Sequence, residues 1–96
     1  MKCAFSERAF NQLIEIETWI SQHSPQGAAT ILRKIAHSLD LLRTAPRAGA
    51  WDGELTAFVL RVGGTPYNIV YEIHEEANQC LVLSIRDGRR LPGPIQ

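Results

Sequence analysis

The sequence predicts an α+β fold in which a helical hairpin covers one face of an antiparallel sheet, with the element order β-α-α-β-β-β. Three observations lead to this expectation. Apolar residues recur at helical spacing between Ser6 and Pro46, the spacing changes to alternation after about Leu55, and a segment rich in proline and glycine separates the two regions. A chain of 96 residues suits one domain with a modest core, so residues 1–96 are expected to form a single domain.

The first half contains a short strand and two helices. Residues 2–5 are a strand candidate, and Ser6 is a suitable N-cap for the helix that follows. Ser24-Pro25 ends the first helix and starts the second, because proline is favoured at the first helical position. The short connection predicts an antiparallel hairpin. The apolar stripe of the first helix is Ala9, Leu13, Ile16 and Ile20, reinforced by Phe10 and Ile14, and that of the second is Ala28, Leu32, Ile35, Leu39 and Leu42.

The second half is typical of three consecutive antiparallel strands. The segment Pro46 to Glu54 is expected to be a loop, Gly63-Gly64 forms a turn, and EEANQ forms a second turn. In the middle strand, Tyr67, Ile69, Tyr71 and Ile73 are expected to face the helices. In the last strand, Leu81, Leu83 and Ile85 alternate with Val82, Ser84 and Arg86. The opposite, more polar face is expected to carry Arg61, Asn68, Glu72, Ser84 and Arg86.

The charge balance excludes a generally basic protein. Ten lysine and arginine residues match ten acidic ones, which predicts little direct binding of nucleic acid. The last segment is locally basic, however, because Arg86, Arg89 and Arg90 face a single acid, Asp87. Such a segment suits a local anionic or protein contact.

Cysteine and histidine usage predicts neither a metal site nor a secreted protein. Cys3 and Cys80 are the two cysteines, and His23 and His37 lie on helices without a second ligand at suitable spacing. The N-terminus lacks the apolar run of a signal peptide, and no stretch is long enough to cross a bilayer, so a cytoplasmic location is expected. A Cys3–Cys80 disulfide requires the two strands to be neighbours, and a reducing compartment disfavours it.

The order of these elements resembles the RelE/ParE superfamily of toxins from bacterial toxin–antitoxin modules. The matching segments are SERAFNQLIEIETWI, LRTAPRAG, VLRVGGTPYNIVYEI and LVLSIRDGRR. The proline-started second helix and the PYNIVYEI strand are most similar to the ParE branch. The resemblance implies a single RelE/ParE-like toxin domain without a cofactor. It also implies a ParD-like antitoxin whose C-terminal segment folds on binding, so that a toxin–antitoxin hetero-oligomer is expected.

The superfamily has two activities, and Asn68 helps to distinguish them. RelE-type members cut mRNA on the ribosome, and they carry an arginine where this chain has Asn68, which cannot offer a cationic fork to phosphate. The preceding strand offers only Arg61, and no aromatic residue follows Tyr71. The resemblance therefore favours a ParE-type toxin that poisons DNA gyrase without being an enzyme. The alternatives are a ribosome-dependent endoribonuclease of RelE type and a family member with little toxicity.

Two groups of residues are candidates for binding. In the last strand, IRDGRR keeps the arginines of ParE-type toxins but has Asp87 where a histidine is usual. If Trp19 is exposed together with Ile16 or Ile20, these residues would mark an antitoxin groove. Trp51 either fills the edge of the core or is available to bind a partner. The candidates for target binding are Arg61, Asn68, Arg86, Arg89 and Arg90, and those for antitoxin binding are Ile16, Trp19, Ile20 and Trp51.

Overall fold

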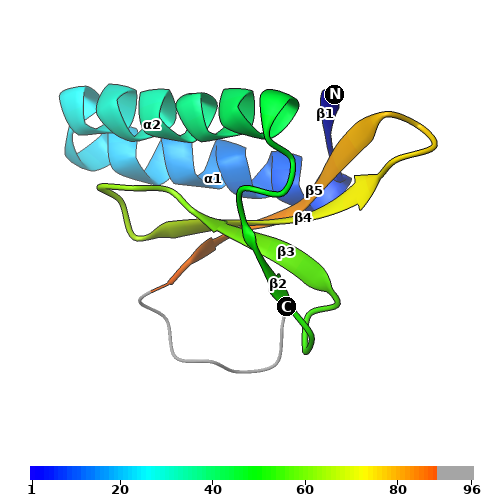
Figure 1. Cartoon of the computed structure of the whole chain (residues 1–96). Helices are drawn as coiled ribbons and strands as arrows, with labels where there is room; N and C mark the ends of the chain where they lie inside the picture. Colours follow the sequence, from blue (N-terminus) through cyan, green and yellow to red (C-terminus); the bar gives the residue numbers. More distant parts are fainter. Residues whose placement is uncertain (89–96) are drawn as a thin grey trace.

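The computed structural model describes residues 1–88, which form a five-stranded sheet with two helices on one face (Figure 1). The sheet order is β1-β5-β4-β3-β2. The predicted α+β fold is therefore confirmed. In the described part of the chain, neither helix is long and apolar enough to cross a membrane. The elements are β1 (Lys2–Phe5), α1 (Glu7–His23), α2 (Pro25–Thr44), β2 (Ala50–Asp52), β3 (Ala57–Arg61), β4 (Tyr67–His74) and β5 (Gln79–Asp87).

The sheet differs from the predicted one at both edges. Residues 50–52, expected to lie in a loop, form the short strand β2, in which Trp51 pairs with Phe58 of β3. At the other edge, β1 runs parallel to β5, so the sheet is mixed and not wholly antiparallel. Three residues between glycines and a proline carry too weak a pattern to identify a strand, and only pairing with β3 makes them extended.

Serine caps set the helix boundaries where the sequence predicts them. The Ser6 hydroxyl accepts a hydrogen bond from the Ala9 amide at 3.1 Å, and the Ser24 hydroxyl accepts one from the Gly27 amide at 3.0 Å. Pro25 occupies the first turn of α2, where its missing N–H leaves nothing unsatisfied. The two helices then run as an antiparallel hairpin across the sheet (Figure 1).

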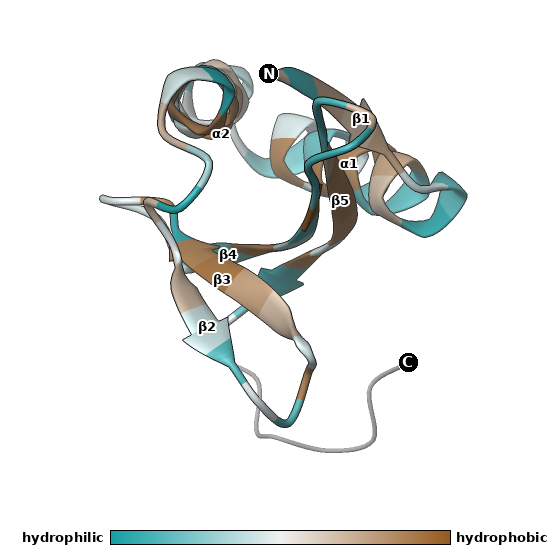
Figure 2. Cartoon of the chain, turned by 45° about the vertical axis from the view of Figure 1, so that its right-hand side comes forward, coloured by the Kyte–Doolittle hydropathy of each residue, from teal (hydrophilic) through white to brown (hydrophobic). Residues whose placement is uncertain are grey.

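The core lies between the helical hairpin and the sheet. The strands β3, β4 and β5 carry most of the hydrophobic colour in Figure 2, whereas β2 is more polar. Phe10 and Ile14 do not join this core, contrary to expectation, since they are 55% and 48% exposed. At 100° per residue they lie on the flank of α1, about a quarter turn from the buried stripe. The cluster of buried residues comprises Ala9, Ile35, Leu42, Val62, Tyr67, Ile69, Tyr71, Cys80, Val82 and Ile85.

A bulge in β5 changes which of its residues face the helices. Tyr71 pairs with Val82 but Val70 pairs with Ser84, so Leu83 is an extra residue. Val82 and Ile85 are both buried in the core although three positions separate them. The expectation that Leu81, Leu83 and Ile85 share one face is therefore wrong, because an inserted residue reverses the alternation beyond it.

The buried Tyr71 hydroxyl holds the connection between α2 and β2 against the sheet. It donates a hydrogen bond to the Pro46 carbonyl at 2.7 Å and accepts one from the Gly49 amide at 3.0 Å. Burial raises the pKa of Tyr71, so the phenol stays protonated and able to donate. A Cβ atom at Gly49 would lie 2.8 Å from both the Tyr71 hydroxyl and the Val59 carbonyl oxygen, which leaves room only for glycine.

Replacing Tyr71 by phenylalanine should lower the free energy of unfolding by about 1–3 kcal/mol, since it leaves a partly buried carbonyl and amide without this partner. Urea unfolding with a two-state fit measures the loss. Thr30→Ala is the control, because Thr30 donates to the Gln26 carbonyl on an exposed helix surface where water replaces it. The control should change stability by less than about 0.5 kcal/mol. An equally stable Tyr71→Phe protein would show that this connection is not held by the hydroxyl.

Candidate functional site

The sheet face opposite the helices brings three of the candidate residues into one row. Arg61 of β3 pairs with Asn68 of β4, and Asn68 pairs with Arg86 of β5. Paired residues on neighbouring strands project from the same face. Because strands lie ~4.8 Å apart, the two arginine backbones are only about 10 Å apart, with Asn68 between them. The predicted polar face is confirmed for these residues.

The row combines two positively charged guanidinium groups with the neutral amide of Asn68. Arg61 is exposed, and Asn68 and Arg86 are partly buried. Within residues 1–88 neither arginine forms an ion pair, so both guanidinium groups can meet an external anion. Each guanidinium offers a planar fork of N–H donors, and the Asn68 amide adds a neutral donor and acceptor. The arrangement suits a carboxylate or phosphate on a partner.

The backbone leaving β5 comes close to this row. The Gly88 amide donates to the Pro66 carbonyl at 2.6 Å, which holds the end of β5 beside the start of β4. A Cβ atom at Gly88 would lie 2.9 Å from Asn68 Nδ2. The absence of a side chain at Gly88 therefore keeps the Asn68 amide accessible. Arg89 and Arg90, the remaining candidates for target binding, lie outside the described residues.

The titratable groups of the same face are too far away to assist chemistry at the row. Glu72 and His74 continue the outward side of β4, and their side chains form a hydrogen bond of 2.9 Å. Glu72 lies four positions after Asn68 in β4, or about 13 Å along the strand, and His74 lies about 20 Å from Asn68. Val70, which is buried, lies between them. Across residues 1–88, no group of three or more His, Cys, Asp or Glu side chains could hold a metal ion.

A row of three aromatic side chains crosses the other side of the sheet at β2. Trp51 meets Phe58 edge-on with ring centroids 5.2 Å apart, and Phe58 stacks on Tyr71 at 5.6 Å. Trp51 is 58% exposed, so it does not fill the core edge. Arg47 lies 6.0 Å above the Phe58 ring and forms an ion pair with Glu75. A shallow pocket of about 310 Å³ adjoins these rings, and it is lined by Trp51, Thr56, Phe58, Glu72, Ile73 and His74.

The expected groove on α1 is not formed as predicted. Trp19 is 59% exposed and stacks on His23 with centroids 4.2 Å apart. Ile16 and Ile20, in contrast, are partly buried and pack against the core. Sequence reasoning missed Phe10 and Ile14, which form an exposed apolar pair one turn apart. Their angular offset from the buried stripe is the signal that could have identified them.

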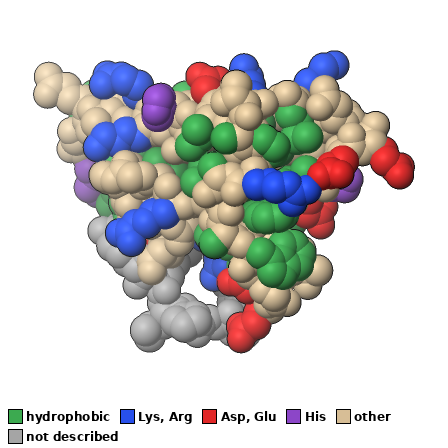
Figure 3. All heavy atoms as spheres, viewed as in Figure 1, with side chains coloured by type: hydrophobic (Ala, Val, Ile, Leu, Met, Phe, Trp, Pro, Cys, Tyr) green, Lys and Arg blue, Asp and Glu red, His purple; other side chains and the backbone are tan. Residues whose placement is uncertain are grey.

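Exposed apolar side chains are therefore distributed over more than one surface. Figure 3 shows hydrophobic side chains reaching the surface over α2 and again in the region of β2 and β3, with charged groups among them. Patches of this kind on a small protein are typical of binding surfaces. They lie on the helix side of the sheet, whereas the row of Arg61, Asn68 and Arg86 lies on the other side.

Comparisons with known proteins agree with this geometry. A family model described as the ParE toxin of the type II toxin–antitoxin system parDE matches residues 4–92. A solved chain of a chromosomal ParDE toxin–antitoxin system from P. aeruginosa superimposes with a TM-score of 0.76 at 16% sequence identity. The superposition covers 91% of this chain and 95% of that one. At this identity it shows a shared fold. No curated protein sequence matches the chain.

Proposed function

The chain belongs to the family of ParE toxins of type II toxin–antitoxin systems, and on that premise we propose that it arrests growth by binding and poisoning DNA gyrase. A toxin of such a system has an antitoxin as its partner. We extend this proposal to a cognate ParD-like antitoxin that covers the exposed side chains of Trp51 and Trp19.

The observation that carries the proposal is the row of Arg61, Asn68 and Arg86. Within residues 1–88 its two guanidinium groups form no ion pair, and they flank a neutral amide on the sheet face opposite the helices. Such a surface can bind an anionic partner through charge-assisted hydrogen bonds. Among residues 1–88, the acid and base on this face of β4, Glu72 and His74, are remote from the row. A toxin that poisons another enzyme needs to bind that enzyme and does not need to catalyse a reaction itself.

The alternative, a ribosome-dependent endoribonuclease of RelE type, needs more than this row provides. Cleavage of RNA requires a general base for the attacking hydroxyl, an acid for the leaving oxygen, and cations for the developing charge. Proton-transfer groups must come within about 3 Å of the reacting atoms. In the described face the cations are present, but the acid–base pair lies more than 10 Å away along β4. Asn68 also stands at the position of the arginine in RelE-type members.

Purified protein should therefore not cut mRNA on ribosomes, and Asn68→Arg should not create this activity, because catalytic groups that act as a unit fail together. Primer extension on a translated message measures cleavage. In parallel, the toxin is incubated with gyrase and relaxed or supercoiled plasmid, and the DNA breaks trapped by gyrase are measured. Codon-dependent cuts by the natural protein would overturn the proposal in favour of the RelE-type alternative.

Removing both guanidinium groups of the row should weaken gyrase poisoning at least tenfold without unfolding the protein. The test pair is Arg61→Ala with Arg86→Ala, and the matched control is Arg8→Ala with Arg33→Ala, two exposed arginines on the helices. Both variants lose two positive charges, so a difference between them reports the row and not the net charge. Exposed arginines contribute about 0–1 kcal/mol to stability, and thermal melting checks this.

The locally basic end of the sequence supplies two further candidates for target binding. Arg89 and Arg90 follow Arg86 in the chain, and Arg89→Ala with Arg90→Ala belongs in the same assay. If the row variant and this variant both poison gyrase as well as the unaltered toxin does, neither set of arginines makes the contact. Equal losses in the row variant and in the helix control would show that only net charge matters.

Trp51→Ala should weaken binding of the cognate antitoxin at least tenfold, because an exposed, rigid aromatic ring at the mouth of a pocket is a typical hot spot. Trp19→Ala tests the second proposed antitoxin surface, on α1. Phe10→Ala is the matched control, since this aromatic residue has a similar exposed fraction. Isothermal titration with the antitoxin measures affinity. A loss confined to Phe10→Ala would move the interface to the other flank of α1.

A further inference from the structure

The two cysteines of the chain are direct neighbours in the sheet. Cys3 of β1 pairs with Cys80 of β5 in the parallel register. Adjacent strands place paired Cα atoms ~4.8 Å apart, which lies within the Cα separations found for disulfides, about 4.4–6.8 Å. Both cysteines are free thiols in this structure. The two residues are 77 positions apart in the sequence, so local sequence patterns do not show this contact.

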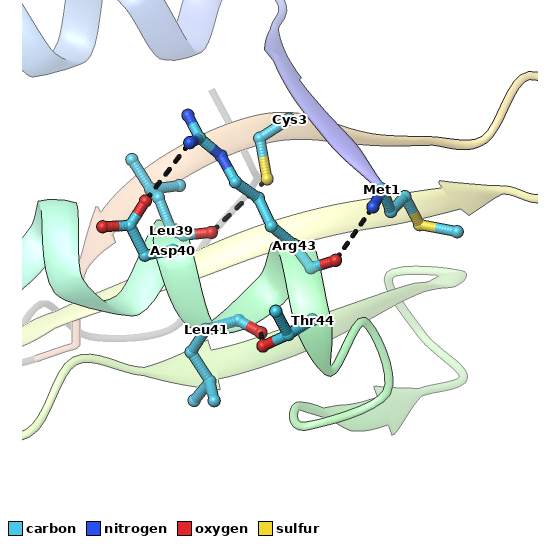
Figure 4. A network of polar contacts seen from close by, with 7 residues as sticks. All are labelled: Met1, Cys3, Leu39, Asp40, Leu41, Arg43 and Thr44. Atoms are coloured by element: carbon cyan, nitrogen blue, oxygen red, sulfur yellow. Dashed lines mark hydrogen bonds and ion pairs between the residues drawn. The ribbon is translucent and has the colours of Figure 1, made fainter.

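Both thiols point toward the C-terminal half of α2. Cys3 donates to the Leu39 carbonyl at 3.5 Å, and Cys80 lies 3.9 Å from the Leu42 carbonyl, one helical turn further on. The Cys80 sulfur is also 3.4 Å from the Met1 sulfur. Figure 4 shows Cys3 and the N-terminal amine of Met1 reaching the same stretch of α2, where the amine donates to the Arg43 carbonyl at 2.9 Å. The strand β1 is thus held so that the two thiols lie side by side on the helix side of the sheet.

The two thiols differ in access to solvent. Cys80 is fully buried, whereas Cys3 on the edge strand is only partly buried. Burial, and in addition the neighbouring Cys3, raises the pKa of the Cys80 thiol. Cys3 is therefore the thiol that a small oxidant meets first, and Cys80 is positioned behind it as a resolving thiol.

We infer that Cys3 and Cys80 form a reversible disulfide when the protein meets hydrogen peroxide. The Cys3 thiolate attacks one peroxide oxygen, so that an S–O bond forms, the O–O bond breaks, and hydroxide leaves and is protonated to water. The Cys80 sulfur then attacks the sulfenic sulfur of Cys3. The S–S bond forms, the S–O bond breaks, and the hydroxyl leaves as a second water with the Cys80 proton. Two thiols and one peroxide give one disulfide and two waters, and a dithiol reductant reverses the change.

The disulfide would join β1, at one edge of the sheet, to its neighbour β5. It would close a loop that contains both helices and the strands β2, β3 and β4, which restricts the unfolded chain strongly. Oxidation is therefore expected to stabilise the toxin, raising the Tm by on the order of 10 °C. The thiols lie on the helix side of the sheet, away from the row of Arg61, Asn68 and Arg86. Gyrase poisoning is expected to persist in the oxidised protein.

The test treats the reduced, folded protein with a small excess of hydrogen peroxide and follows three readouts. Both thiols should disappear together in maleimide labelling, and the intact mass should fall by two hydrogens. Trypsin, without reduction, should release residues 3–8 linked to residues 62–86, the peptides that contain the two cysteines. The Tm should rise and return to its original value after addition of a dithiol.

Two variants distinguish the mechanism from nonspecific oxidation. In Cys80→Ala, peroxide should leave Cys3 as a sulfenic acid that a cyclic 1,3-diketone traps, with no rise in Tm. In Cys3→Ser, the buried Cys80 should react at least tenfold more slowly. Over-oxidation of Cys3 beside an intact Cys80 thiol in the unaltered protein would overturn the inference. So would disulfide-linked dimers, or a linkage that forms only in denaturant.

Discussion

The candidate target surface depends on a single inserted residue, Leu83. Before the bulge, Cys80 and Val82 face the helices, and beyond it Ile85 does so. An uninterrupted register would pair Tyr67 with Arg86 and Ile69 with Ser84, placing a guanidinium and a hydroxyl against the helices and Ile85 in solvent. The bulge avoids the free-energy cost of burying these polar groups, and it sets Arg86 beside Asn68 on the face opposite the helices. One residue thus completes the core and also assembles the row that we propose as the gyrase contact.

The same sheet face explains how one fold can support either catalysis or binding. A nuclease needs cations and proton-transfer groups within hydrogen-bond distance of one phosphate, whereas a binding surface needs only complementary charge and shape. Here two arginines flank an amide, and the hydrogen-bonded pair of Glu72 and His74 lies several residues away on β4. Charged groups at a surface contribute mostly to association rate and specificity, so the effect of the row should weaken as salt concentration rises.

The helix side of the sheet is organised by contacts between distant segments. Tyr71 holds the connection after α2 through a carbonyl and an amide, and its ring supports Phe58, against which Trp51 lies. At the opposite edge, Met1 and Cys3 reach the end of α2, which places Cys3 against Cys80. These contacts leave Trp51 and Trp19 as exposed aromatic side chains on two different surfaces.

The sequence by itself determined the elements that local chemistry controls. Ser6, Ser24 and Pro25 define the helix boundaries, and alternation identifies β3, β4 and the polar face with Arg61 and Asn68. Tertiary structure alone decided the rest: the strand at Trp51, the parallel pairing of Cys3 with Cys80, the exposure of Phe10, and the bulge at Leu83. Caps and periodicity act within a few residues and leave a local signal. Strand partners, bulges and the width of a buried helix face are fixed by packing between segments far apart in the chain, because only there does burial stabilise one arrangement over another.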